Sequence, residues 1–254
     1  LVLNSSPSAT SADVLVASGV ATSYKSGAVK LLSGDAENGK SGSINLNVGS
    51  SNNEDGGDIT LEAGLASGFR EGGGIALLSG RGGKTGGMIS IMSSDSVNGN
   101  DGKSGDILLA SGESNGNVKS GVIRIQSGNT DNENAGNVVI EGGSATGALN
   151  GAGGAISLKS GKSVSGNAGS IVIQSGSGGE LGSSSGNIML ESGVSPTGSS
   201  GSLILETGGA TGGDGGDVQI LVGDGDLGSG GDVAISAGTT WSIGDEGGIV
   251  AVYG

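Results

Sequence analysis

Cysteine and histidine are absent from this 254-residue chain, and only four of its residues are aromatic. Without Cys there are no disulfides and no thiolate metal sites, and without His the usual catalytic triads and zinc sites are excluded. Paired carboxylates remain, but enzymes that cleave polysaccharides with them generally need aromatic platforms and basic partners in a cleft. The sequence therefore predicts a protein that is not an enzyme, with no catalytic and no cofactor-binding residues.

Positive charge is also scarce. The chain has 11 Lys and Arg residues and 25 Asp and Glu residues, which gives a formal net charge of −14. Nucleic-acid binding needs clustered Lys and Arg, so this class of partner is not expected. No run of 18 apolar residues exists, so membrane insertion through a helix is not expected either. The first residues lack the basic start and apolar core of a signal peptide, and we interpret the chain as a mature form or a fragment.

Glycine is abundant, with 59 residues, and it takes part in a repeat. The repeat has the form G-x-h-x-h-x-s-G, where h is Ile, Val or Leu and s is a small residue. Clear copies are residues 42–49, 57–64, 105–112, 169–176 and 231–238. The first apolar residue of each repeat is Leu1, Val14, Val29, Ile44, Ile59, Ile75, Ile89, Ile107, Ile123, Val138, Ile156, Ile171, Ile188, Leu203, Val218, Val233 and Val250. These are 17 repeats with a mean step of about 15.6 residues, and they predict a single repeat domain over residues 1–254.

The pattern within each repeat is typical of a short β-strand. Apolar residues at every second position point to one face of a strand, and Ile and Val suit a pleated backbone. Flanking Gly residues permit positive φ and hence a sharp bend, while the linking segments are rich in Asn, Asp, Gly and Ser. The sequence therefore predicts an all-β protein.

Near-identical strands at even spacing favour a β-solenoid over an antiparallel sandwich, because like strands stack well on copies of themselves. The residue between the two apolar positions alternates along the chain. It is mostly apolar in one set of strands (Leu15, Asn45, Ala76, Leu108, Val139, Val172, Ile204 and Ala234) and mostly polar in the other. This alternation predicts two different sheets, and hence two strands, or about 31 residues, per coil.

Four of the middle residues define a candidate lateral interface. Leu108, Val139, Val172 and Ile204 would stack on the outward face of one sheet. Single exposed apolar residues are normal on β-surfaces, whereas a contiguous stripe usually marks a contact with another chain. Both interpretations stay open at this point.

Trp241 is the only tryptophan, and it comes just before the last repeat. Because the terminal repeats of such arrays are usually atypical caps, we expect Trp241 to cover the open end of the core. Stacking against a ligand is the alternative.

Acidic turns raise the question of calcium. Residues 53–58, 131–134, 224–226 and 244–247 are rich in Asp, Glu, Asn and Gly, and residues 212–220 resemble a calcium-binding nonapeptide repeat. The apolar position of that stretch is displaced by one residue, and the period of this chain is longer than that of a nonapeptide. We therefore expect solvated turns, no metal-ligating residues and no cofactor, with Ca²⁺ as the alternative.

The repeats GDITLEAG, GDVAISAG and GNVVIEGG resemble, distantly, the strand motifs of filamentous-haemagglutinin-type adhesins. More closely, the Ser-Gly-flanked form resembles the Gly/Ser-rich β-solenoid repeats of algal and stramenopile surface proteins. This resemblance implies an extracellular or cell-surface protein, and it transfers no functional residue.

Together these features predict a structural repeat protein of an extracellular filament, appendage, sheath or adhesin stalk. Exposed strand edges at both ends would favour self-association into filaments. The alternative is a binding module for carbohydrate or for an ice surface, which would use one flat sheet face.

Overall fold

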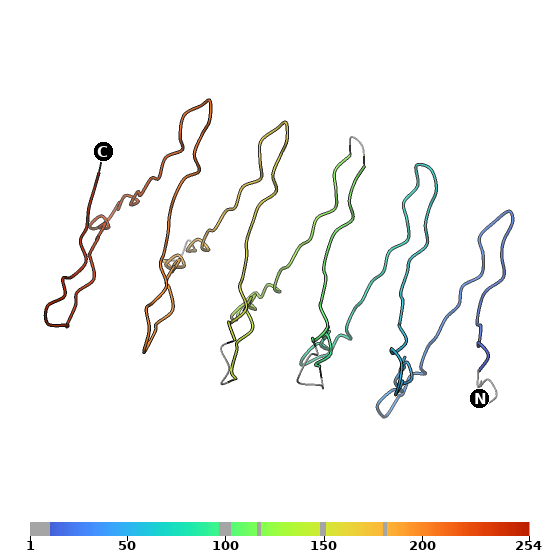
Figure 1. The fold of residues 1–254 in the computed structure, drawn as a ribbon. Coiled ribbons are helices and arrows are strands. Elements are labelled where there is room, and N and C mark those ends of the chain that lie inside the picture. The colour runs from blue at the N-terminus through green and yellow to red at the C-terminus, as the bar shows by residue number, and fades with distance from the viewer. Residues whose placement is uncertain (1–10, 97–102, 116–117, 148–150, 180–181, 254) are drawn as a thin grey trace. The chain divides into compact units, whose positions relative to one another are not determined.

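A computed structural model describes residues 11–96, 103–115, 118–147, 151–179 and 182–253. This part of the chain contains no helix and no strand, and Figure 1 accordingly shows neither coiled ribbons nor arrows. The predicted all-β fold, and with it the β-solenoid, is therefore wrong. The described residues form irregular coil, and they contain no helix that is long and apolar enough to cross a membrane.

The reason lies in the backbone hydrogen bonds. A β-strand is defined by hydrogen bonds to a neighbouring strand, so a repeat that pairs with no other segment is not a strand. Among the described residues, the backbone hydrogen bonds join positions that lie close together in the sequence, such as Gly73 and Gly64. The repeat predicted from the alternating pattern is present, but the pairing between repeats that would make a sheet is absent from the described chain.

Two kinds of segment alternate along the chain. We call each eight-residue stretch of the form G-x-h-x-h-x-s-G a repeat segment, and its length is the same from residues 27–34 to residues 231–238. The loops between these segments vary in length, as the short loop 81–86 and the longer loop 95–104 illustrate. Figure 1 shows long stretches of chain joined by narrow loops.

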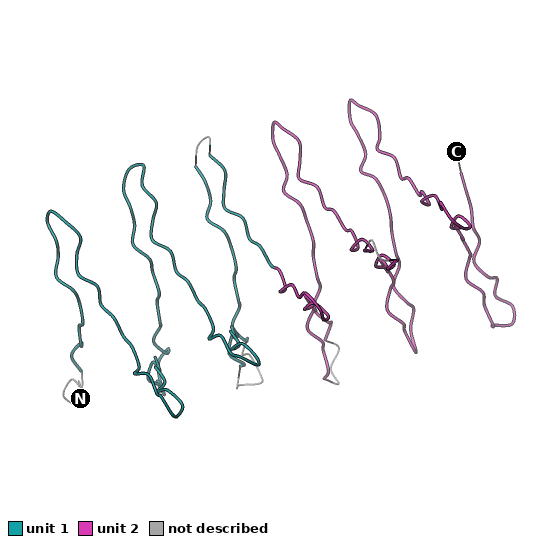
Figure 2. Ribbon diagram, turned by 180° about the vertical axis from the view of Figure 1, so that it is seen from behind, with its two compact units in different colours: residues 1–125 teal, residues 126–254 magenta. Residues whose placement is uncertain are grey.

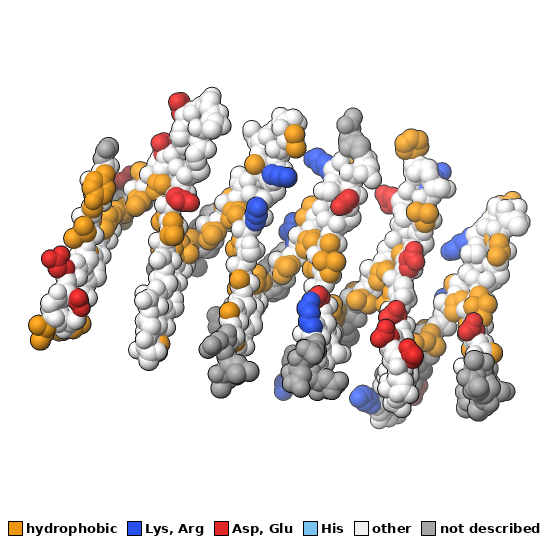
Figure 3. All heavy atoms as spheres, in the orientation of Figure 1, with side chains coloured by type: hydrophobic (Ala, Val, Ile, Leu, Met, Phe, Trp, Pro, Cys, Tyr) orange, Lys and Arg blue, Asp and Glu red, His pale blue; other side chains and the backbone are white. Residues whose placement is uncertain are grey.

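No hydrophobic core exists in the described part of the chain, because none of its apolar side chains is buried. The first apolar residue of the described repeat segments remains 45% (Ile123) to 60% exposed (Leu203). The predicted core of Ile, Val and Leu between two sheets, with two strands in each coil, is therefore also wrong. Figure 3 shows hydrophobic side chains open on the surface in the part of each unit that faces the viewer.

The chain divides into two units, residues Leu1–Ile125 and Gln126–Gly254, which Figure 2 shows in teal and magenta. Each unit contains several repeat segments with their loops. The first unit includes the segments from residues 27–34 to residues 105–112, and the second includes those from residues 136–143 to residues 231–238.

Positive φ angles occur in the loops and not at the segment ends. Among the described residues, the left-handed conformation is restricted to Gly68, Gly182, Gly212, Gly228 and Gly244, and all five lie in loops. The described Gly residues that flank the repeat segments lack it, so the expected sharp bend through positive φ at each segment end is wrong.

Candidate self-association surface

The junction between successive repeat segments is the most regular feature of the structure. The Gly that opens a segment lies against the small residue near the end of the preceding segment. A Cβ atom added to this Gly would lie 3.7 Å from the Cβ of Ser33 at Gly42, and 2.9 Å from Cγ1 of Val222 at Gly231. At tight junctions such as Gly231 the preceding segment leaves little room for a side chain, whereas at junctions such as Gly42 an added Cβ would make an ordinary contact.

Backbone hydrogen bonds close several of these junctions. The amide nitrogen of the opening Gly donates to the carbonyl oxygen of the last residue of the preceding segment, as in Gly87 to Gly80 and Gly169 to Gly161, at 2.8 and 2.9 Å. The same bond joins Gly73 to Gly64, Gly105 to Ser94, Gly154 to Gly143, Gly186 to Gly176 and Gly248 to Gly238. Each of these loops therefore begins and ends at nearly the same point, and its length has little effect on the junction.

Hydroxyl groups order several loops from within. In three loops a Ser hydroxyl oxygen accepts a hydrogen bond from the amide nitrogen three residues later. The donor and acceptor residues are Glu54 and Ser51, Gly166 and Ser163, and Gly198 and Ser195. Such turns satisfy a backbone donor without help from another segment. The sequence predicted polar turns in these loops, and the structure adds this specific hydrogen bond.

The residues that come closest to burial are small, and most of them lie at the junctions, while Ala66, Ser114 and Ser195 lie in loops. Half-buried positions include Ala63, Ser127, Ser160, Ser175 and Ala237, all of which precede the last residue of a repeat segment. The larger Ile, Val and Leu side chains within the same segments are exposed. One chain thus packs its junctions and leaves its rows of apolar side chains uncovered.

The four residues of the candidate lateral interface are all strongly exposed. Leu108 is 89% exposed, and Val139, Val172 and Ile204 are between 70% and 80% exposed. Leu108 belongs to the first unit and the other three to the second. Hydrogen bonds within the described chain link only positions close in the sequence, so none of them ties the three segments of the second unit into one stripe. Their role as an interface stays a prediction.

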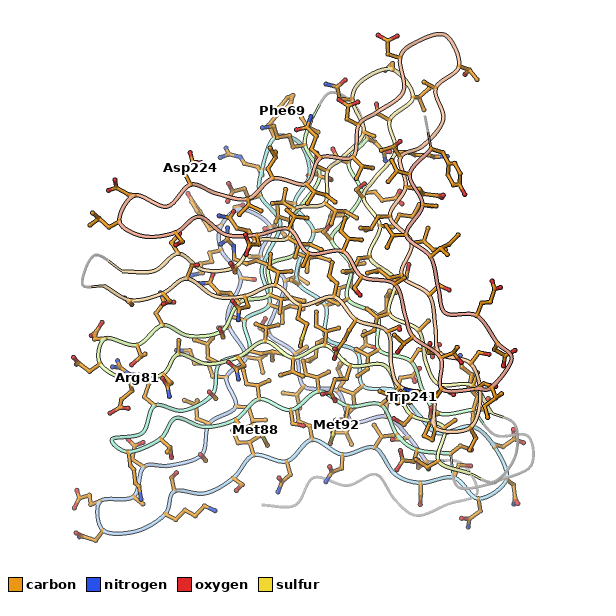
Figure 4. All side chains as sticks on the ribbon, turned by 90° about the vertical axis from the view of Figure 1, so that its left-hand side faces the viewer. Phe69, Arg81, Met88, Met92, Asp224 and Trp241 are labelled. Atoms are coloured by element: carbon orange, nitrogen blue, oxygen red, sulfur yellow. The ribbon has the colours of Figure 1, made fainter. Side chains whose placement is uncertain are left out.

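Trp241 lies in the loop 239–247, where the amide nitrogen of Ser242 donates to Oγ1 of Thr240 at 3.1 Å. Figure 4 shows its labelled side chain, and 97% of its surface is exposed. Its expected role as an end cap stays a prediction. Phe69, labelled in the same figure, likewise lies fully exposed in the loop 65–72.

The acidic turns do not converge in the described structure. No group of three or more Asp or Glu residues there is placed to hold a metal ion, and no pocket is present in that part of the chain. An ion pair joins Lys103 Nζ and Asp106 Oδ2 at 3.0 Å, with both side chains exposed. Ca²⁺ binding, the alternative interpretation of the turns, gains no support from this geometry.

Comparison with known proteins gives no relative: no family model, no curated protein and no solved structure matches this chain.

Sequence reasoning missed the contact between the opening Gly and the preceding small residue. The signal was available, because the eight-residue length of the repeat segment stays constant while the loops change length. Such constancy indicates that the two ends of a segment meet fixed partners.

Proposed function

We propose that this chain is a structural repeat protein of an extracellular filament, appendage, sheath or adhesin stalk, and that it works by self-association and without catalysis. The observation that carries the proposal is the row of apolar side chains in every described repeat segment, none of which is buried. Exposed apolar surface on this scale marks a site of association, because water disfavours it.

The regularity of this surface supports a structural role. A binding module concentrates its contacts at one site, whereas here the same segment recurs along the chain with equivalent side chains. The binding-module alternative depends on a flat sheet face, and the described residues form no sheet. No observation favours that alternative for carbohydrate or for ice.

Negative-stain electron microscopy of the purified chain across a concentration series tests the proposal. Filaments or rods that lengthen with concentration are expected. A matched series in which Leu108 and Val172 are both replaced by Lys provides the comparison, since both side chains are exposed and neither supports a junction. Particles of uniform small size at every concentration, for the unchanged chain, would contradict self-association.

A further inference from the structure

Exposed apolar side chains recur in every described repeat segment of both units. The first apolar residue of these segments is 45% (Ile123) to 60% exposed (Leu203), and the middle residues Leu108 and Val172 are 89% and 80% exposed. Contiguous exposed apolar surface usually marks a contact with another chain. A partner that contacts one patch would leave most of these side chains uncovered, so a partner that covers them has to follow the repeat segments along each unit.

The backbone of the repeat segments also has hydrogen-bonding groups without a backbone partner in the described residues. In the described residues, the backbone hydrogen bonds involve the segment ends and leave the three central residues of each segment without a backbone partner. Rows of free N–H and C=O groups on a chain with alternating Ile, Val and Leu side chains are a template for pairing with another chain.

The constant length of the segments indicates what kind of chain fits. Each repeat segment has the same eight-residue length, with apolar side chains at its third and fifth positions. A segment of equal length and equal apolar spacing pairs with it over its whole length, while the loops accommodate differences between repeats. A partner with the same period and the same segment length is available in the chain itself.

The prolines agree with a backbone that is used for pairing. The chain has only two, Pro7 and Pro196, and neither lies in a repeat segment. Proline lacks the N–H that a paired strand donates, so it is excluded from paired segments and tolerated in loops.

We propose that the partner is a second copy of this chain, and that the repeat segments of different copies pair through backbone hydrogen bonds. β-Structure then arises between chains, on association, and is absent from the chain alone. This inference rests on the proposed function, because it specifies how the self-association occurs.

Two Val residues that lie eight positions apart provide a matched test. Val172 is the middle residue of the repeat segment 169–176, and Val164 is in the adjoining loop 162–168. In that loop Ser163 accepts a hydrogen bond from Gly166, as Ser195 does from Gly198 in the loop that naturally contains Pro196. Val164→Pro therefore copies a proline that the same kind of turn already accommodates, while Val172→Pro removes a donor from a repeat segment.

The experiment follows far-UV circular dichroism and sedimentation velocity of the full chain over a concentration series. For the unchanged chain, the β-signal is expected to rise together with the sedimenting mass. Val172→Pro is expected to raise the concentration needed for both changes about fivefold, which corresponds to the loss of about one backbone hydrogen bond. Val164→Pro is expected to leave that concentration unchanged.

The outcomes separate this inference from the proposed function. Association without any gain of β-structure would overturn the pairing of backbones and leave the structural role intact, as would equal effects of the two prolines. A β-signal that is independent of concentration would overturn the inference too. A chain that stays monomeric at every concentration would overturn both.

Discussion

The amide nitrogen of Gly87 donates a hydrogen bond to the carbonyl oxygen of Gly80 at 2.8 Å, and this bond closes the loop 81–86. A Cβ atom at position 87 would lie 3.3 Å from both the amide nitrogen of Gly80 and the Cβ of Ser79. The loop closure thus depends on the absence of a side chain at Gly87. The same relationship recurs at junctions along both units, which makes the junction a local property of the repeat.

Gly87→Val is expected to push the two segment ends apart and to break this hydrogen bond. Because a backbone hydrogen bond is worth about 1 kcal/mol, hydrogen exchange of the amide at position 87 is expected to accelerate about fivefold. Gly83→Val in the same loop is the control, since a Cβ there meets nothing within 4 Å. Equal exchange rates at position 87 in the two variants would show that the close approach is unimportant.

Ser163→Ala is expected to loosen the loop 162–168, because Oγ of Ser163 accepts the hydrogen bond of the Gly166 amide at 2.9 Å. Hydrogen exchange at Gly166, measured by NMR, is expected to become a few times faster, in line with about 0.5–1 kcal/mol for one such bond. Ser165→Ala removes a hydroxyl from the same loop without touching this bond, and it is expected to leave the rate unchanged. An effect of equal size from both variants would argue against the specific turn.

Replacing Leu108 and Val172 with Lys is expected to abolish association, because both side chains are exposed in the single chain and would carry charge into any contact between chains. Light scattering across a concentration series measures this. The control is a double variant with Val164→Lys and Val194→Lys, which adds the same charge at two exposed loop positions. It is expected to associate like the unchanged chain. Normal association of the Leu108 and Val172 variant would remove these residues from the interface.

Association is expected to strengthen with ionic strength, because each chain has a formal net charge of −14 and like charges repel. The Debye length falls from about 30 Å at 0.01 M salt to about 8 Å at 0.15 M, so the repulsion between chains is then largely screened. Sedimentation velocity at these two salt concentrations is the measurement. Weaker association at the higher concentration would indicate that attraction between opposite charges holds the chains together.

The predicted spacing of small residues is present at the junctions, but the described residues show neither the predicted positive φ at the segment ends nor the predicted strands between them. The positions of Gly42 and Ser33, or of Gly87 and Ser79, follow from spacing alone, and in the structure they lie against each other. The strands expected around Ile59 and Ile171 do not form, and these side chains are 56% and 53% exposed instead of buried in a core. The alternation of apolar residues indicates that a segment is suited to pairing as a strand. It does not identify the segment that would be its partner.

For the candidate interface, too, the sequence pattern identifies the residues but not their contacts with other segments. Leu108, Val139, Val172 and Ile204 were selected from the pattern of middle residues, and the structure places all four at the exposed surface. Whether they form one stripe depends on contacts between repeat segments, which neither the spacing nor the local hydrogen bonds supply. The role expected of Trp241 depends likewise on a core that the described chain lacks.

The sequence by itself determined the period, the eight-residue segments, the polar loops and the small residues at the junctions. These features follow from residue size and spacing, whereas the contact between the opening Gly and the preceding small residue became visible only in the structure. Only the tertiary structure decided that the repeat segments of the described chain remain unpaired and that their Ile, Val and Leu side chains stay exposed. The physical reason is that a sheet needs hydrogen bonds between one segment and another, and the pattern of residues within a segment does not specify that partner.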